Sequence, residues 1–82
     1  MTVRVHVPAG WNVTGELPVL AGDPPLHIDD PDGSFELDVE WSGDAFVGGA
    51  RIGEAESVIR AASPTTIREW ALGALAMVQK SS

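Results

Sequence analysis

The chain of 82 residues contains no cysteine, so neither a disulfide nor a thiolate zinc site can stabilise it. This composition fits a reducing compartment. Long apolar runs are also missing. Residues 1–11 alternate charged and apolar side chains, unlike a signal peptide, and the weakly polar run 70–78 is far shorter than the roughly 20 residues that span a bilayer. We therefore expect a cytoplasmic protein.

Basic residues are scarce: five lysines and arginines stand against twelve acidic residues, and the net charge is −7. Such a chain repels phosphate backbones and anionic membrane surfaces, so we expect no direct binding of nucleic acid and no membrane binding. A protein partner with a basic surface fits the charge better. The length predicts one small globular domain, residues 1–82, and the 44% of hydrophobic residues is an ordinary value for a globular chain.

The residue patterns that mark common catalytic and nucleotide-binding sites are absent. No G-x-S-x-G sequence surrounds a serine, and neither H-x-x-x-H nor H-E-x-x-H occurs. The glycine-rich stretch 48–53 fits neither G-x-G-x-x-G nor the lysine-bearing P-loop pattern. We therefore predict that the chain is not an enzyme and has no catalytic residue and no cofactor.

The stretch DDPDGSFE, residues 29–36, places acidic residues around a glycine, as a calcium loop would. An EF-hand loop needs acidic residues at its first and twelfth positions, but with Gly33 as its sixth residue these positions hold Ile28 and Val39. An EF-hand is therefore excluded. The sequence Asp-Pro-Asp-Gly at 30–33 instead favours a turn, in which proline presets φ and glycine takes the left-handed position. A weaker alternative is an irregular calcium site built from Asp29, Asp30, Asp32 and Glu36.

Histidine supplies the remaining candidate metal ligands. His27 lies close to Asp29 and Asp30 in sequence, and these side chains are of the types that bind metal ions. Histidine metal sites usually have more donors at recognisable spacing, so we predict no metal site and interpret His6 and His27 as structural or solvent-facing residues. A metal-dependent enzyme built on His27 and the nearby aspartates is the least supported hypothesis.

The clearest secondary-structure signal lies in residues 35–41, where four apolar residues alternate with three acidic ones. Period two is typical of a strand with one buried and one solvent-exposed face. Ser-Gly-Asp at 42–44 is a plausible hairpin connection, so we predict a hairpin of strands 34–41 and 45–52.

Weaker signals predict additional strands. Residues 2–7 alternate valine with polar residues and predict a half-buried strand. Short extended pieces are expected near Val13, at 19–21 and at 26–28. The paired glycines at 48–49 weaken the returning strand of the hairpin and predict a bulge or a close approach by another backbone.

The strongest helix signal begins at Ser63, which can cap a helix, and Pro64, which suits the first helical position. Apolar residues then recur at helical spacing and predict an α-helix over 64–79. Residues 54–62 are ambiguous: four apolar residues have helical spacing, which favours a short helix, but two adjacent β-branched residues keep a strand as the alternative. The predicted fold class is α+β, a small antiparallel sheet of about four strands packed by a C-terminal helix.

Two surfaces of this predicted fold are candidate binding sites for a protein, and the first is an acidic row formed by Glu36, Asp38 and Glu40. Successive members lie about 6.6 Å apart on one side of a strand. This is close to the phosphate spacing of an extended nucleic-acid strand, so the row could imitate DNA or RNA. The simpler interpretation is that a sheet with one wet face carries polar groups there and that Arg4 and His6 neutralise them from an adjacent strand.

The second surface is a helix strip formed by Leu72, Gly73 and Ala76, away from the apolar face of the predicted helix. Glycine inside a helix costs roughly 1 kcal/mol relative to alanine, which a close contact with a second helix would explain. Coverage of the strip by residues 54–62 of the same chain is an equally good explanation.

These patterns predict a non-enzymatic, acidic protein-binding domain that acts through the helix strip or the acidic row, with a homodimer as one form of the contact. The first alternative is an inhibitor that mimics nucleic acid and occupies the basic groove of a DNA- or RNA-binding protein, as a small viral or mobile-element protein would. The second alternative, from a different class, is the metal-dependent enzyme.

Overall fold

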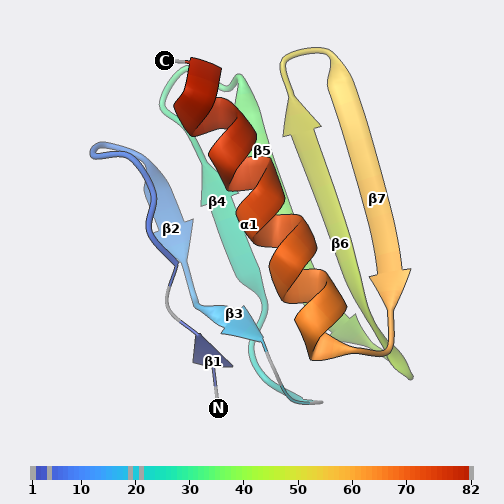
Figure 1. The fold of residues 1–82 in the computed structure, drawn as a ribbon. Coiled ribbons are helices and arrows are strands. Elements are labelled where there is room, and N and C mark those ends of the chain that lie inside the picture. Colours follow the sequence, from blue (N-terminus) through green and yellow to red (C-terminus); the bar gives the residue numbers. More distant parts are fainter. Residues whose placement is uncertain (1, 4, 19, 21, 82) are drawn as a thin grey trace.

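A five-stranded antiparallel sheet with one helix across one of its faces forms the fold of the computed structural model, which describes residues 2–3, 5–18, 20 and 22–81 (Figure 1). The elements are β1 (Thr2–Val3), β2 (Asn12–Thr14), β3 (Leu17–Pro18), β4 (Leu26–Asp29), β5 (Phe35–Ser42), β6 (Ala45–Ile52), β7 (Ala55–Ala61) and α1 (Pro64–Ser81). The sheet has the order β2-β4-β5-β6-β7, and β1 pairs separately with β3. The predicted α+β class is thus confirmed.

The predicted hairpin and helix are both present. Strands β5 and β6 pair in continuous register from Phe35 opposite Ile52 to Ser42 opposite Ala45. Helix α1 begins at the predicted Pro64 and ends at Ser81, two residues beyond the predicted end. Among the described residues, no helix combines the length and the hydrophobicity that crossing a bilayer requires.

The prediction of a helix at 54–62 is wrong, because residues 55–61 form β7. This strand pairs with β6 along its whole length, from Ala55 opposite Ile52 to Ala61 opposite Phe46. The two strands are joined by a tight turn in which Gly53 has a φ of 61°, a conformation that glycine adopts without strain. Pairing with β6 therefore outweighs the weak local preference for helix.

The hydrophobic core lies between α1 and the face of the sheet that α1 covers. Period two in β5 and helical spacing in α1 place apolar side chains on these facing sides. The core residues are Leu17, Leu26, Ile28, Phe35, Leu37, Val39, Phe46, Ala50, Ile67, Ala71, Ala74 and Leu75. Complete burial of a large apolar side chain contributes about 1.5–3 kcal/mol to stability.

The predicted bulge at the paired glycines is wrong, because the β5–β6 register runs without interruption through Gly48 and Gly49. Gly48 lies instead where α1 crosses the sheet. A Cβ atom at Gly48 would lie 2.5 Å from Cζ3 of Trp70 and 3.0 Å from Cγ2 of Ile59, whereas a Cβ at Gly49 would have no neighbour within 4 Å. The close approach at this position is therefore made by a side chain and not by another backbone.

The N-terminal third of the chain is less regular than predicted. The strand expected at 2–7 is limited to β1, and residues 5–7 lie outside a strand, although Val5 and Val7 pack against the core. Arg4 lies outside the described residues. Of the short strand expected at 19–21, only Leu20 is described, and it is exposed and not in a strand. The pieces expected near Val13 and at 26–28 are present as β2 and β4.

Helix α1 crosses the sheet obliquely. It starts beside the end of β7 and runs away from that strand towards β4 and β5 (Figure 1). The helix therefore leaves the first half of β7 largely uncovered, and Ala55 and Ser57, which face the helix side, are exposed. This leaves one corner of the helix side of the sheet open.

Candidate functional site

The acidic row lies on the open face of the sheet, opposite the face that α1 covers. Its three residues alternate with the buried apolar residues of β5: Glu36 is half-buried, and Asp38 and Glu40 are exposed. The geometric part of the prediction is therefore correct, since period two separates an apolar side from an acidic side.

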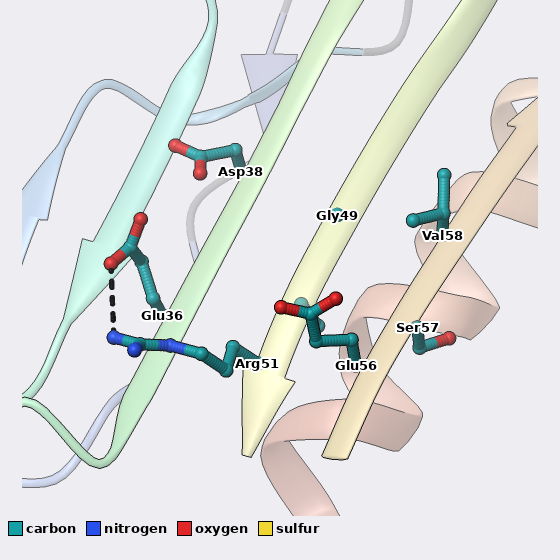
Figure 2. A pocket seen from close by; sticks show the side chains of 8 residues that line it. Glu36, Asp38, Gly49, Arg51, Glu56, Ser57 and Val58 are labelled. Carbon is teal, nitrogen blue, oxygen red and sulfur yellow. Dashed lines mark hydrogen bonds and ion pairs between the residues drawn. The ribbon is translucent and has the colours of Figure 1, made fainter. Parts of the chain in front are cut away.

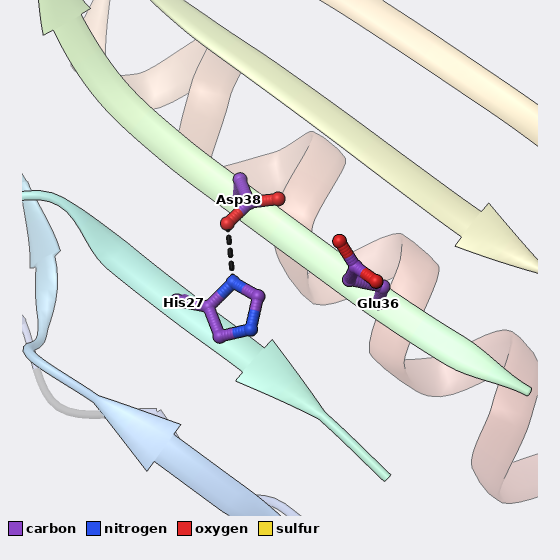
Figure 3. Close-up of side chains that lie close together, drawn as sticks. All are labelled: His27, Glu36 and Asp38. Atoms are coloured by element: carbon purple, nitrogen blue, oxygen red, sulfur yellow. Dashed lines mark hydrogen bonds and ion pairs between the residues drawn. The ribbon is translucent and has the colours of Figure 1, made fainter. Parts of the chain in front are cut away.

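The row is partly neutralised from the two adjacent strands. His27 of β4 lies directly opposite Asp38 and forms a short hydrogen bond with it (Figure 3). Arg51 of β6 lies opposite Glu36 and donates to Oε2 of that residue at 3.4 Å (Figure 2). Glu40 forms no ion pair with any described residue. Among the described residues, the row thus consists of two cross-strand ion pairs and one carboxylate, Glu40, without an ion-pair partner.

The sequence predicted the wrong cations for this neutralisation. Arg4 lies outside the described residues, and His6 lies in a segment that does not pair with β5. Strand order decides which cations reach the row, and His27 and Arg51 come from the strands next to β5. Their cross-strand positions follow only once the register is known.

The hydrogen bond to Asp38 raises the pKa of His27 above its usual 6.5, and the negative charges of Asp38, Asp29 and Glu36 act in the same direction. Partial burial of the ring acts in the opposite direction and is the smaller effect. The second ring nitrogen, Nε2, lies 3.5 Å from Oδ1 of Asp29. Protonated His27 thus sits between two carboxylates.

Stability should depend on the protonation of His27. Because the folded-state pKa is raised, the stabilisation is fully present below pH 6.5 and is lost as the pH rises through the folded-state pKa. His27→Gln should therefore lower the free energy of unfolding by about 0.2–1 kcal/mol near pH 6 and by less near pH 8.5. Urea unfolding at several pH values measures this difference.

His6→Gln is the matched control, because His6 is exposed and forms no ion pair with a described residue. The difference in free energy of unfolding between His6→Gln and the wild type should stay constant across the pH range. A His27→Gln deficit that stays constant from about pH 6 to about pH 8.5 would contradict the proposed charge on His27.

His27, Glu36 and Asp38 could together offer a metal ion one nitrogen and two oxygen ligands, all within 4.8 Å of one another (Figure 3). However, Asp38 already binds His27, and the Arg51 guanidinium beside Glu36 would repel a cation. This arrangement fits an ion-pair network better than a metal site, and the cluster includes neither Asp30 nor the other aspartates of the turn.

The turn at 30–33 forms as predicted, and hydrogen bonds to the buried carboxylate of Asp30 stabilise it. The Asp30 carboxylate, only 6% exposed, accepts hydrogen bonds from the Ser34 hydroxyl at 2.5 Å and from the Phe35 N–H at 3.0 Å. The Ser34 bond, assisted by the backbone N–H groups, lowers the pKa of Asp30. Gly33 has a φ of 76°, as the turn requires. Asp30 thus organises the turn, and this explains its position without a calcium ion.

An apolar surface feature lies on the other side of the molecule, where α1 moves away from β7. An apolar groove of about 570 Å³ opens there between the helix and the uncovered corner of the sheet. It is lined by Ala50, Ile52, Ala55, Ser57, Glu69, Trp70, Gly73, Ala74 and Met77. Trp70 forms the inner wall, and its Nε1 donates to Oγ of Ser57 at 3.1 Å. Helical spacing places Met77 on the same face of α1 as the core residues, but its side chain is 62% exposed because it lines the groove.

The helix strip adjoins this groove. Gly73 lines the groove directly, while Leu72 and Ala76 lie on the neighbouring solvent side of α1, and Leu72 is 44% exposed. The alternative that residues 54–62 cover the strip is wrong, because that segment is part of the sheet and a Cβ at Gly73 would have no neighbour within 4 Å. The groove and the strip form one continuous surface on the helix side.

Sequence reasoning missed the edge strand β7 as a surface. Its residues Glu56 and Val58 line a shallow depression on the open face, together with Arg51, Glu36 and Asp38 (Figure 2). The signal in the sequence was the pair of adjacent β-branched residues at 58–59, which is typical of a strand.

Comparison of the chain with protein-family models, curated proteins and solved structures finds no match.

Proposed function

We propose that this chain is a non-enzymatic, cytoplasmic protein-binding domain whose contact surface is the helix side, formed by the apolar groove and the helix strip. The supporting observation is that the oblique path of α1 leaves the groove open between Trp70 and β7. Contiguous exposed apolar surface on a small domain is typical of a protein contact.

The chemistry of the groove fits a protein contact better than catalysis. Of its nine described lining residues, Glu69 is the one with an ionisable side chain, so the groove lacks the convergent titratable groups of an active site. Trp70 and Met77 supply aromatic and flexible apolar area, which is enriched at the centres of protein interfaces. An apolar segment of a partner would fill the groove.

Charged residues in the groove or on the strip should abolish the contact without unfolding the domain. Ala55→Glu places a carboxylate on the groove floor and Ala76→Glu places one on the strip, and both positions are exposed. We expect each variant to lose the proteins that the tagged wild-type chain retains from an extract of its native host, as quantified by mass spectrometry.

Ala9→Glu is the matched control, because Ala9 is exposed on the loop before β2, at the opposite edge of the sheet. It should retain the same proteins as the wild type. Equal retention by all three variants, with unchanged melting temperatures, would contradict a contact on the helix side.

The second candidate function is binding of a basic protein by the open face. It is favoured by one observation, the exposure of Asp38 and Glu40 on a face that no described element covers. Mimicry of nucleic acid has less support, because His27 and Arg51 compensate two of the three carboxylates of the row. The two surfaces can be distinguished with Glu40→Lys, on the open face, and Glu69→Lys, in the groove. If Glu40→Lys no longer captures a basic partner while Glu69→Lys still does, the partner binds the open face and not the helix side.

A further inference from the structure

Strand β7 is an edge of the sheet, and no described strand pairs with its outer side. It pairs with β6 on one side, and the strand order ends with it. Protein edges are usually blunted by proline, bulges, very short strands or charged side chains, and β7 has only the last of these, Glu56 and Arg60. The seven residues of β7 include no proline or glycine and pair with β6 without a bulge, and Val58 in the middle is 79% exposed. The opposite edge, β2, has only three residues.

Symmetry limits how a second copy could pair with this edge. In an antiparallel pair, residues directly opposite each other point to the same face of the sheet. A two-fold axis perpendicular to the sheet keeps every residue on its own face, and adjacent residues point to opposite faces. The axis must therefore pass through one residue that lies opposite its own copy. An axis at Val58 is the one that pairs all seven residues of β7. It places Glu56 opposite Arg60 of the second copy, and the same pair occurs again on the other side of the axis.

The neighbouring registers lose this complementarity. An axis at Ser57 places Glu56 opposite Val58, and an axis at Ile59 places Arg60 opposite Val58. Opposite charges that face each other across strands stabilise pairing, and directly opposed like charges destabilise it. In the chain itself, Glu56 forms no ion pair with a described residue, and Arg60 donates to the highly exposed Asp44, which leaves the rest of its guanidinium fork available.

The same register also bears on the apolar groove. Antiparallel pairing would place Ala55 of one copy opposite Ala61 of the other, which lies three residues before Pro64, the first residue of α1. The open corner of each groove then lies beside the start of the helix of the second copy. In such a dimer each chain would cover part of the corner that α1 of the other chain leaves open.

We propose that the partner of this domain is a second copy of the same chain, bound antiparallel along β7 with Val58 facing Val58 across a two-fold axis. The inference rests on the proposed function, because the second copy would lie beside the open corner of the apolar groove at β7. The two five-stranded sheets then form one continuous sheet, with both helices on the same face.

Cysteine cross-linking tests the register directly, because the chain has no cysteine of its own. Residues opposite each other in an antiparallel pair have Cα atoms about 4.5–5.5 Å apart, within disulfide range. Val58→Cys should therefore form a covalent dimer in high yield under mild oxidation. Glu56→Cys is the matched control, since two copies of residue 56 would lie about 13 Å apart along the strands. A low yield for Val58→Cys, or equal yields for both, would overturn the proposal.

A charge exchange tests the same contact without a cross-link. Glu56→Arg and Arg60→Glu each place like charges opposite each other, so each should raise the dimer Kd about tenfold, measured by sedimentation at concentrations from about 10 µM to about 1 mM. The double variant should restore the wild-type Kd. Double and single variants with the same Kd would overturn the proposed register.

Failure of this inference is distinguishable from failure of the proposed function. A wild-type chain that stays monomeric at about 1 mM overturns the second copy as partner. If such a monomer still loses its captured proteins on Ala55→Glu, the proposed contact on the helix side stands with a different partner.

Discussion

Replacement of Gly48 by alanine is expected to lower the free energy of unfolding by about 1–3 kcal/mol. The added Cβ would lie 2.5 Å from Cζ3 and 2.9 Å from Cη2 of Trp70, which is closer than van der Waals contact allows. Because Trp70 also donates to Ser57, its indole has little freedom to move away. Either α1 shifts away from the sheet or Trp70 leaves its position. Urea unfolding of the two proteins measures the difference.

Gly49→Ala is the matched control for this substitution. The neighbouring glycine lies in the same strand, and a Cβ there would have no neighbour within 4 Å. Alanine in place of a strand glycine normally stabilises by about 0.5–1 kcal/mol, so this variant should equal or exceed the wild type in stability. Equal destabilisation by Gly48→Ala and Gly49→Ala would mean that α1 does not pack against β6 through Trp70.

The largest loss of stability is expected from Phe35→Ala, about 3–5 kcal/mol. Phe35 is 1% exposed, and its ring centroid lies 4.9 Å from that of Trp11, so truncation leaves a cavity and removes an aromatic contact. For a domain of this size the loss is a large part of the total stability. Calorimetry or urea unfolding should show a variant that is mostly unfolded at moderately elevated temperature.

Glu40→Ala, in the same strand, is the control for Phe35→Ala. Glu40 is exposed on the open face, and its removal should change the free energy of unfolding by less than about 0.5 kcal/mol. The ratio of the two effects tests whether period two in β5 separates a buried side from a wet side. Comparable losses from both substitutions would refute that arrangement.

The β5–β6 hairpin and α1 could be predicted from the sequence because each has a strong local pattern. In β5 every second residue from Phe35 to Trp41 is apolar, and the Ser-Gly-Asp sequence at 42–44 predicts the connection to its partner strand, which the structure forms with Gly43 and Asp44. In α1 proline at the first position and apolar residues at helical spacing define the start and the buried face. These signals require no knowledge of distant contacts.

The identity of β7 and the role of Gly48 depended on contacts that the local sequence does not contain. The apolar residues of segment 54–62 have helical spacing while the β-branched pair at 58–59 favours a strand, and pairing with β6 decides between the two. The glycine at 48 is explained by Trp70, which lies 22 positions later in the chain. The direction in which α1 crosses the sheet, and therefore the apolar groove, follows from this packing.

The candidate sites were predictable to different extents. The acidic row follows from period two alone, but its cations, His27 and Arg51, could be assigned only from the strand order. For the helix strip the sequence left two alternatives, a partner contact or coverage by residues 54–62, and the groove beside it includes Ala55 from that same segment.

Hydrogen exchange of the wild-type chain at low and high concentration tests the proposed self-association most directly. Every second amide of an edge strand points away from its neighbour and exchanges freely unless another strand binds there. We expect protection of residues 55–61 to increase with concentration, with little change in residues 36–40. Exchange that is identical at both concentrations, or protection that increases only at 36–40, would contradict a contact through β7.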